Sequence, residues 1–477
     1  MTKCTKASQN LQLRFSFGTG KPIVADFNGG QISTDGGLCL IRQIDDKLKI
    51  TEQASLCLGE KRRADLIKHS NHDLLKQRIF AIAAGYEDGN DAQTLRFDPM
   101  HKLSVGRALS DGELASQPSI SRFENKVNDT ELKYLQDLLV HLYVQQHAKP
   151  PRKIVLDLDT TCDPVHGYQQ LSFFNGFYGT YCYIPMFVFD ESGFPLAALL
   201  RPGNSDVGGD AANVLRRIFP ILRSAWPSVA IEFRADAAFC RREVYQVCEE
   251  YQVSYFIGLK SNHALRCLAK DLVNSARDEF VALYGEPLKL EKNAWRRKEE
   301  SMRFASKDEG RMQESFEAGR FVRKVGQLSW LGRGYTQDMR VICRTDFTDD
   351  GPELRFVITN HKLGNPRWLY ENRYCGRGQC ENWIKELKSI SVDRLSCQEF
   401  NANQFRLIEH ALAYILLLGL RKHLPAKLKS LSATQIQLRF IRLGVLVLDS
   451  VRRTYLRWTS TYPWKLEFMQ LSNQLRI

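Results

Sequence analysis

The chain has 477 residues, of which 43% are hydrophobic and 25% are charged. These fractions are ordinary for a globular protein, and they exclude a mostly disordered, collagen-like or low-complexity chain. Lys and Arg outnumber Asp and Glu by 67 to 54, so the net charge is +13. This surplus favours a polyanionic partner, either nucleic acid or an acidic membrane surface.

The start of the chain lacks the apolar stretch of a secretory signal. The longest apolar run, residues 411–420, is too short to cross a bilayer and indicates a buried helix. The twelve Cys residues are scattered, without the density of a disulfide scaffold or the spacing of common zinc sites. We therefore expect a cytoplasmic protein with no membrane partner.

Residues 1–148 are predicted to be mostly helical. Apolar residues recur at helical spacing from Leu38 to Leu48, and again over residues 130–147. The Lys-Pro-Pro-Arg sequence at 149–152 then breaks the helical pattern and marks a boundary.

Residues 149–261 have a different pattern, in which β-branched and alternating segments predict strands. The predicted elements are, in chain order, a strand at 154–161, a hairpin at 183–203, a helix at 209–222, a strand at 229–236, a helix at 241–252 and a strand at 253–260. A hairpin followed by alternating helices and strands indicates an α/β layer fold with a mixed sheet.

Residues 262–365 return to strand-like alternation and predict a β-rich insertion, and helices follow over 366–423. We expect the region 424–477 to be helical as well. From Arg421 onward, eleven Lys and Arg stand against two acids, so this segment carries nine of the thirteen net charges. Such a density indicates either contact with a polyanion or a solvated basic face.

Three carboxylates stand where an α/β scaffold presents functional groups. Asp159 lies in the first predicted strand, Asp236 at the end of a later strand, and Glu381 on a late helix. Each has an ordinary alternative when taken alone. Asp159 can cap a turn, Asp236 can cap a helix, and Glu381 can pair with Lys385. Convergence of all three would require a divalent cation such as Mg²⁺ or Mn²⁺, and two such ions can catalyse phosphoryl transfer.

The surroundings of the third acid favour convergence. The segment has the pattern Y-x2-R-x3-E-x6-K, with its members at Tyr374, Arg377, Glu381 and Lys388. A helix that begins by Arg377 places the two cations and the carboxylate along one face. A carboxylate beside two cations and a phenol suits a metal-bound phosphate, with the ring available to stack on a base.

This pattern resembles the YREK signature of bacterial insertion-sequence DDE transposases. Further segments resemble the insertion-sequence family numbered thirteen-eighty, and they occur in the order STDGGLCLIRQIDDKL, QPSISRFEN, LDLDTT, RPGN, FRADAAF and NRYCGRGQCENWIKELK. The similarity runs from about residue 30 to about residue 420. It departs at Ala237 and Ala238, where relatives often carry Ser-Gly, and this departure removes no ligand.

The resemblance implies a ribonuclease-H-like catalytic domain, a mixed sheet with flanking helices, interrupted by the β-rich insertion. It implies that Asp159, Asp236 and Glu381 hold two Mg²⁺ or Mn²⁺ ions. Asp157 shares a face with Asp159 on the predicted strand, so it is an alternative candidate for the first metal ligand. The position directly before Thr160 favours Asp159. The implied partners are double-stranded DNA, from the transposon ends and the target, and a second copy of the chain in a synaptic homodimer. When bound to DNA, the protein would associate with the bacterial nucleoid.

Residues in every region except 149–261 are expected to contact DNA, and the helical region 1–148 is expected to serve as the DNA-binding region. The expected contacts are Tyr374, Arg377 and Lys388 by the resemblance, Ser121 and Arg122 on a segment like the second helix of a helix-turn-helix, Trp330 and Arg323 in the insertion, and Arg452 and Arg453 in the basic tail. Two alternatives stay open. The helix-turn-helix-like segment can be an ordinary surface helix, and Trp330 can either stack on a flipped base or anchor the core of the insertion.

We therefore predict a cut-and-paste DNA transposase. It would bind terminal inverted repeats, cleave the ends by two-metal hydrolysis, and join the freed 3′-hydroxyl to target DNA by transesterification. One alternative is a two-metal nuclease of the same fold that cuts without joining. Another is a non-catalytic DNA-binding protein derived from a transposase, which the presence of all three acids disfavours.

Overall fold

The computed structural model describes residues 12–17, 21, 23–287, 320–332 and 338–476. These residues divide into two compact units. The core unit comprises Leu56–Gly59 and Glu124–Ile415, and the terminal unit comprises the described parts of Met1–Ser55, Glu60–Phe123 and Leu416–Ile477. The three predicted acids all lie in the core unit.

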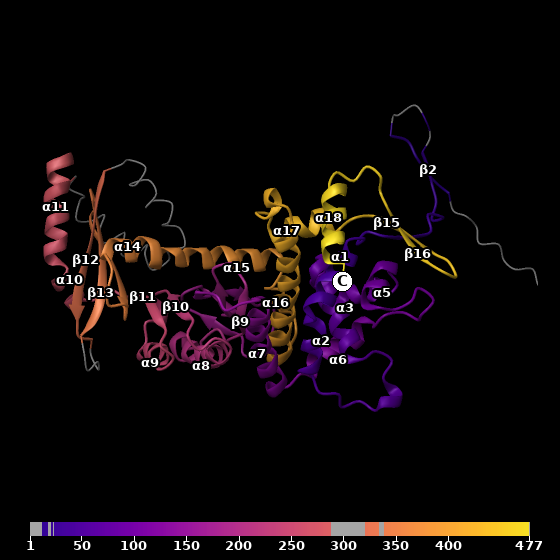
Figure 1. Ribbon diagram of the computed structural model, residues 1–477, viewed down its shortest axis with the longest axis horizontal. Helices are drawn as coiled ribbons and strands as arrows, with labels where there is room; N and C mark the ends of the chain where they lie inside the picture. Colours follow the sequence, from indigo (N-terminus) through magenta and orange to yellow (C-terminus); the bar gives the residue numbers. More distant parts are fainter. Residues whose placement is uncertain (1–11, 18–20, 22, 288–319, 333–337, 477) are drawn as a thin grey trace, which may run out of the picture. The chain divides into compact units, whose positions relative to one another are not determined.

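The core unit is built around an eight-stranded mixed sheet (Figure 1). Its strands are β4 (Lys153–Thr160), β8 (Met186–Asp190), β9 (Pro195–Leu199), β10 (Ala230–Ala235), β11 (Ser254–Leu259), β12 (Phe321–Trp330), β13 (Met339–Thr348) and β14 (Gly351–Thr359). They are ordered β12-β13-β14-β11-β10-β4-β8-β9. The neighbours β4, β10 and β11 are parallel, and every other neighbouring pair is antiparallel. Both β4 and β8 are buried almost throughout, as expected for strands covered on both faces.

Helices cover both faces of this sheet. Those of the core unit are α7 (Asp129–Gln145), α8 (Val207–Ala225), α9 (Arg242–Glu250), α10 (His263–Leu268), α11 (Lys270–Tyr284), α14 (Pro366–Trp368), α15 (Gln379–Ser389) and the part of α16 (Phe400–His423) up to Ile415, with short turns η3 (Ala237–Phe239), η4 (Leu369–Tyr374) and η5 (Cys375–Gly378). The helices α8 and α9 lie on one side of β10 and β11, and α15 lies on the other (Figure 1). None of the described helices is long and apolar enough to span a bilayer.

The predicted strands and helices of residues 149–261 are all present, in the predicted order. One element of this region was not predicted. Between β4 and β8 the chain forms a small second sheet from β5 (Asp163–Pro164), β6 (Phe173–Asn175) and β7 (Thr180–Tyr183), in the order β5-β7-β6.

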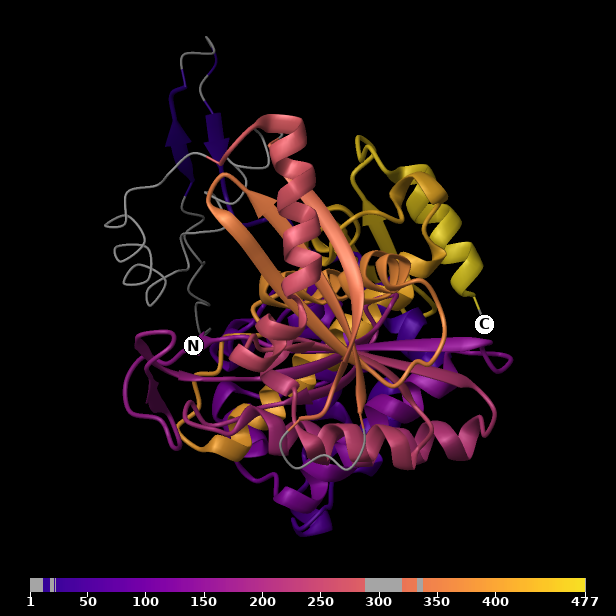
Figure 2. The same ribbon diagram turned by 90° about the vertical axis from the view of Figure 1, so that its left-hand side faces the viewer.

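The insertion differs from its prediction. It begins with the two helices α10 and α11, and its strands extend the central sheet, because β14 pairs with β11. The helix α11 lies along β12 and β13 (Figure 2) and packs the apolar side chains of Ala276 and Phe280 against Val322 and Phe347. The alternating pattern predicted these strands, but it contained no information about their partners.

The terminal unit combines segments from both ends of the described chain. Its elements are β1 (Leu13–Phe15), β2 (Ile23–Ala25), β3 (Gln31–Ser33), α1 (Leu38–Leu48), α2 (Ile50–Leu56), η1 (Ala64–Leu66), α3 (Asn71–Ala84), η2 (Gly89–Asp91), α4 (Ala92–Leu95), α5 (Pro99–Val105), α6 (Gln117–Asn125), η6 (Ala426–Leu428), α17 (Ala433–Ile436), η7 (Gln437–Ile441), β15 (Val445–Asp449), β16 (Thr454–Trp458) and α18 (Lys465–Leu475). The prediction that 424–477 is helical is wrong for β15 and β16, which form a sheet with β3.

The glycines of the STDGG segment explain how the two ends meet within this unit. The Gly36 amide donates a hydrogen bond to the Leu443 carbonyl over 2.8 Å. A Cβ atom on Gly37 would lie only 1.8 Å from the Phe440 carbonyl oxygen. No other residue type fits this close backbone approach, so the glycine pair is a packing requirement.

Candidate active site

The sheet brings the first two acids to the same edge. Asp159 lies near the carboxyl end of β4, and Asp236 directly follows β10. These strands are parallel, with Ala235 opposite Leu158, so the next residues along them are the two acids. The alternatives considered from the sequence are also present. Asp159 Oδ1 accepts a hydrogen bond from the Thr160 amide over 2.8 Å, and Asp236 Oδ1 accepts one from the Ala238 amide over 2.9 Å. Each cap fixes one oxygen of its carboxylate.

Arg377 links the first acid to the third. Its Nη1 atom donates to Asp159 Oδ2 over 3.1 Å, and its Nη2 atom lies 3.7 Å from Glu381 Oε1. Glu381 is in the first turn of α15 and its side chain is about half exposed, at 52%. In the part of the chain that the structure describes, its ion-pair partner is Arg377 and not Lys385.

The site holds more negative than positive charge. Burial raises the pKa of Asp159 to about 6, against the opposing effect of Arg377, and the charges of Asp236 and Glu381 raise it further. The three carboxylates therefore share one electrostatic environment, with a single guanidinium between two of them. Negative charge gathered around a buried carboxylate is the condition that a divalent cation relieves.

The donor chemistry fits Mg²⁺ or Mn²⁺, which prefer carboxylate oxygens. Among the described residues, no three His, Cys, Asp or Glu side chains stand close enough together to hold an ion as they are. The Arg377 guanidinium lies between two of the acids, where it supplies the neutralising charge. Metal binding would therefore require the guanidinium to move aside.

The raised pKa of Asp159 predicts how metal-free stability depends on pH. Its folded pKa of about 6 exceeds the ordinary value of 3.8, so the folded state binds this proton more tightly than the unfolded state. That stabilisation is lost as the pH rises from about 4 to about 6. Asp159→Asn cannot ionise at this position, so the variant does not lose this stabilisation as the pH rises. In EDTA at pH 7, we expect the variant to exceed wild type in free energy of unfolding by on the order of 1–3 kcal/mol.

Urea denaturation across this pH range measures the difference, which should shrink toward pH 4. Mg²⁺ at pH 7 should stabilise wild type and have little effect on the variant, because metal binding requires the deprotonated ligand. A stability difference that is constant between pH 4 and pH 7 would contradict the environment assigned to Asp159.

Asp157 has a different environment from Asp159. It is fully buried, and Arg234 donates to both of its oxygens, from Nε and Nη2, over 2.6 Å each. Both oxygens are therefore occupied, which favours Asp159 as the ligand. The Nη1 atom of Arg234 donates to the Arg373 carbonyl over 2.9 Å, which ties the central strands to the helical segment that carries Arg377.

Arg234 was not identified from the sequence as a site residue. Its signal was present, because it is a cation inside a strand of otherwise mostly apolar residues, in the FRAD segment. A buried arginine needs an anionic partner. Knowledge that β10 lies beside β4 would have identified Asp157 as that partner.

The other two members of the YREK pattern also lie near the acids. The hydroxyl of Tyr374 and the Asp236 carbonyl carbon are close to the same point, 2.7 Å and 3.2 Å from a Cβ built on Gly258. Burial raises the pKa of Tyr374. Lys388 Nζ donates to the Cys162 carbonyl over 2.7 Å. Lys388 therefore holds the segment that follows Asp159, and its contact with DNA stays a prediction.

The helix-turn-helix resemblance is limited to one helix. Ser121 and Arg122 lie on α6, and Arg122 is exposed. The preceding helix α5 ends at Val105, and eleven residues separate it from α6. A helix-turn-helix has a turn of three or four residues. DNA contact by these two residues stays a prediction.

The remaining predicted DNA contacts have varied environments. Arg323 donates to both oxygens of buried Asp346, over 2.7 and 3.0 Å, which gives it a structural partner within the insertion. Trp330 is the last residue of β12 and is partly buried. Arg452 and Arg453 are exposed at the tip between β15 and β16. Contact of these four residues with DNA stays a prediction.

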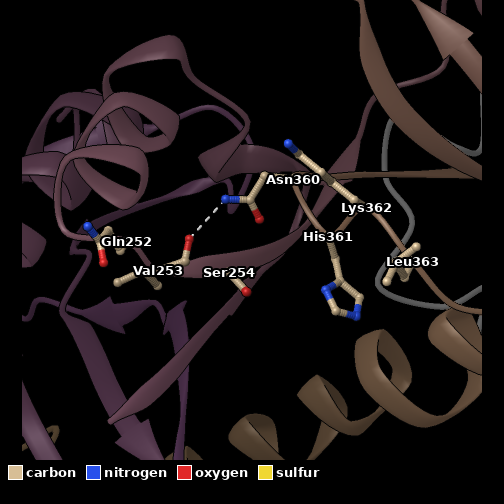
Figure 3. Close-up of a pocket in the computed structure, with 7 residues that line it drawn as sticks. All are labelled: Gln252, Val253, Ser254, Asn360, His361, Lys362 and Leu363. Atoms are coloured by element: carbon tan, nitrogen blue, oxygen red, sulfur yellow. Dashed lines mark hydrogen bonds between the residues drawn. The ribbon is translucent and has the colours of Figure 1, made fainter. Parts of the chain in front are cut away.

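A pocket lies away from the acids (Figure 3). It is lined by Gln252, Val253, Ser254, Asn360, His361, Lys362 and Leu363. Asn360 Nδ2 donates to the Val253 carbonyl across it over 3.0 Å. Ser254 begins β11, which runs parallel to β10 and β4, so the pocket is at the opposite edge of the sheet from Asp159. It is not part of the candidate active site.

A cryo-EM structure of a piggyBac transposase synaptic complex with hairpin DNA is similar, with a TM-score of 0.40 and 10% identity, over 93% of this chain and 82% of that chain. No residue assignment depends on that similarity. Curated protein sequences give no match. A family model described as transposase DDE domain group 1 matches residues 15–477. Because the match spans nearly the whole sequence, the chain belongs to this family of DDE transposase domains.

Proposed function

We propose that the protein is the cut-and-paste transposase of a bacterial insertion sequence, of the YREK group and similar to the thirteen-eighty family. The observation that carries this proposal is that Asp159 and Asp236 end neighbouring strands at one edge of the sheet, while Arg377 lies beside both Asp159 and Glu381. The sheet supports it. The run β9-β8-β4-β10-β11 has three parallel strands beside an antiparallel hairpin, and we propose that it is the ribonuclease-H-like core.

The proposed chemistry uses the three acids as ligands. Asp159, Asp236 and Glu381 would hold two Mg²⁺ or Mn²⁺ ions, which when bound would polarise the scissile phosphate and lower the pKa of the attacking water. Arg377, displaced from the acids, would bind non-bridging phosphate oxygens through its planar group. Tyr374, beside Asp236, would contact the adjacent nucleotide.

The two reaction steps balance without a covalent enzyme intermediate. In the first, the water oxygen bonds to phosphorus and the bond to the 3′ oxygen breaks, which leaves a 3′-hydroxyl on the element end and a 5′-phosphate on the flank. In the second, that 3′-hydroxyl oxygen attacks a target phosphodiester and displaces the target's 3′ oxygen, which leaves as a hydroxyl. No Ser or Tyr nucleophile is required.

The proposed partners are the two ends of the element, the target DNA and a second copy of the chain. Joining two ends in one event requires a synaptic complex, and we propose that a homodimer forms it. The basic tail, with Arg452 and Arg453 at an exposed tip, would contact the phosphate backbone. We propose a cytoplasmic protein that associates with the nucleoid when bound.

An assay with paired ends tests this function. The full chain is incubated with duplexes carrying the inverted repeats that bracket its gene, together with a plasmid target. We expect Mg²⁺-dependent 3′-hydroxyl ends and joined products, with neither in EDTA. Cleavage without joining would replace the proposal with a nuclease of the same fold. Specific binding without cleavage would replace it with a non-catalytic DNA-binding protein.

A further inference from the structure

The small sheet between β4 and β8 carries an aromatic surface without charge. No Lys, Arg, Asp or Glu occurs between residues 164 and 189, in a chain that is one quarter charged. The four most exposed rings of its hairpin β6–β7 have exposed fractions of 86% for Phe177, 59% for Tyr181, 55% for Phe174 and 41% for Tyr178. We call these four residues the aromatic hairpin. Exposed apolar groups gathered on one element mark an interaction site.

The chain segment that carries the aromatic hairpin leaves the central sheet directly after Asp159 and returns to it opposite the same residue. In the central sheet Asp159 pairs with Phe187, and the small sheet is the chain segment between these two partners. It begins at Asp163, only four residues after Asp159. Lys388, from the helix that carries Glu381, donates to the Cys162 carbonyl at this point. Burial, the Cys162 thiol and the charge of Asp159 raise the pKa of Tyr178, which is consistent with a ring close to the carboxylates.

The hairpin is held in one conformation. Asn175 Oδ1 accepts hydrogen bonds from the amides of Phe177 and Tyr178, over 3.0 and 3.2 Å. Asn175 Nδ2 donates to the Gly203 carbonyl over 2.7 Å. A Cβ on Gly203 would lie 2.4 Å from the Phe173 carbonyl oxygen, so the RPGN turn packs directly under the hairpin. The rings of Phe174 and Tyr181 contact each other edge to face, with centroids 5.6 Å apart.

We propose that the aromatic hairpin stacks on unpaired bases of the DNA strand whose phosphate lies at the three acids. This inference rests on the proposed function. Phosphates do not suit an uncharged surface, whereas bases of any sequence stack on exposed rings. The position beside Asp159 favours the nucleotides next to the scissile bond over a protein partner, which would cover the site that the DNA must enter. A rigid hairpin presents its rings at a low entropic cost.

Binding to two single-stranded probes tests the inference without cleavage. The probes are a twelve-residue oligothymidine and an abasic backbone of the same length, which keeps the phosphates and lacks the bases. We expect wild type to bind oligothymidine more tightly. Phe177→Ala with Tyr181→Ala should weaken oligothymidine binding by roughly ten- to a hundredfold and leave the abasic probe nearly unaffected. Tyr181→Phe, which keeps the ring, should bind as wild type does.

Tyr134→Ala is the matched control. This tyrosine is equally exposed, at 57%, but it lies on α7, and its loss should not change either affinity. A second measurement uses the wild-type protein, so its result does not depend on whether a variant folds. Oligothymidine carrying 5-iodouracil should crosslink, on irradiation, to the peptide that contains Phe177 and Tyr178.

Several results would overturn the inference. Equal affinity of wild type for the two probes would do so, as would an unchanged preference in the double variant or crosslinks confined to other peptides. If the double variant instead loses self-association in sedimentation and keeps its preference for bases, the hairpin joins two copies of the chain, and the inference is again wrong. Failure of the transposase proposal is separate. In that case the wild-type protein would prefer the probe with bases but would neither cleave nor join end DNA.

Discussion

Asp236→Asn and Glu381→Gln are each expected to lower Mg²⁺-dependent cleavage of end DNA by roughly a thousandfold or more, with end binding retained. Each change removes one anionic oxygen donor, and metal assistance is worth several kcal/mol in phosphoryl transfer. Neither should unfold the protein. An asparagine at 236 can still accept the Ala238 amide hydrogen bond, and the Glu381 side chain is half exposed.

Single-turnover cleavage with pre-bound end DNA measures the effect on the chemical step, and gel-shift titration in Ca²⁺ or EDTA measures binding. Glu371→Gln is the matched control, because this carboxylate lies ten residues before Glu381 and pairs with Arg367 over 3.1 Å. It should cleave within a few-fold of wild type. Undiminished cleavage by either Asp236→Asn or Glu381→Gln would refute the ligand assignment.

Arg234→Met is expected to cost about 3–5 kcal/mol in free energy of unfolding at neutral pH. The change leaves Asp157 buried in the central sheet without its partner, and an uncompensated buried charge is far more costly than an intact pair is stabilising. Removal of Arg234 also removes the donor to the Arg373 carbonyl, so cleavage should fall as well. The loss of stability should be smaller at pH 5, because an unpaired, buried Asp157 protonates more readily.

Urea denaturation at pH 5 and pH 7.5 measures this loss. Arg367→Met breaks an exposed i,i+4 pair of the same unit and should cost less than about 0.5 kcal/mol. The double variant Asp157→Leu with Arg234→Met replaces the ion pair by apolar groups and should recover most of the stability. A single-variant loss no larger than that of Arg367→Met would show that the pair is not a structural link of the core.

The strands could be predicted where their own pattern of apolar residues and the neighbouring turn both indicated the same pairing. Buried strands such as β4 and β8 are continuous apolar runs, and the turn between β8 and β9 has Gly193 with a positive φ of 84°, so sequence and geometry point to the same hairpin. β15 was missed because its partner β3 is far away in the sequence. The small sheet was missed because its strands have only two to four residues, which are too few for an alternating pattern to be recognised.

The candidate site shows the same division. The three acids and Arg377 were predicted from residue type and spacing. Asp159 and Asp236 lie at the same edge of the sheet, and Arg377 lies beside Asp159 and Glu381, while their role as metal ligands stays a prediction. Arg234 and Tyr178 were not recognised, because their importance depends on which strand lies beside which. The same limit applies to Lys388. Its spacing suggested a phosphate contact, whereas its contact with Cys162 became visible only in three dimensions.

The pairing of β3 with β15 has a consequence for synthesis on the ribosome. Ser33 and Val445 are register partners, 412 positions apart, so at about 5–20 residues per second the early strand waits roughly 20–80 s for its neighbour. The core unit, almost continuous in sequence, can complete its sheet during that delay. A nascent chain would therefore acquire its carboxylate cluster before the terminal unit closes, and a nonsense codon between the core and Phe440 would leave Gly36 and Gly37 without the segment 440–443 that packs against them.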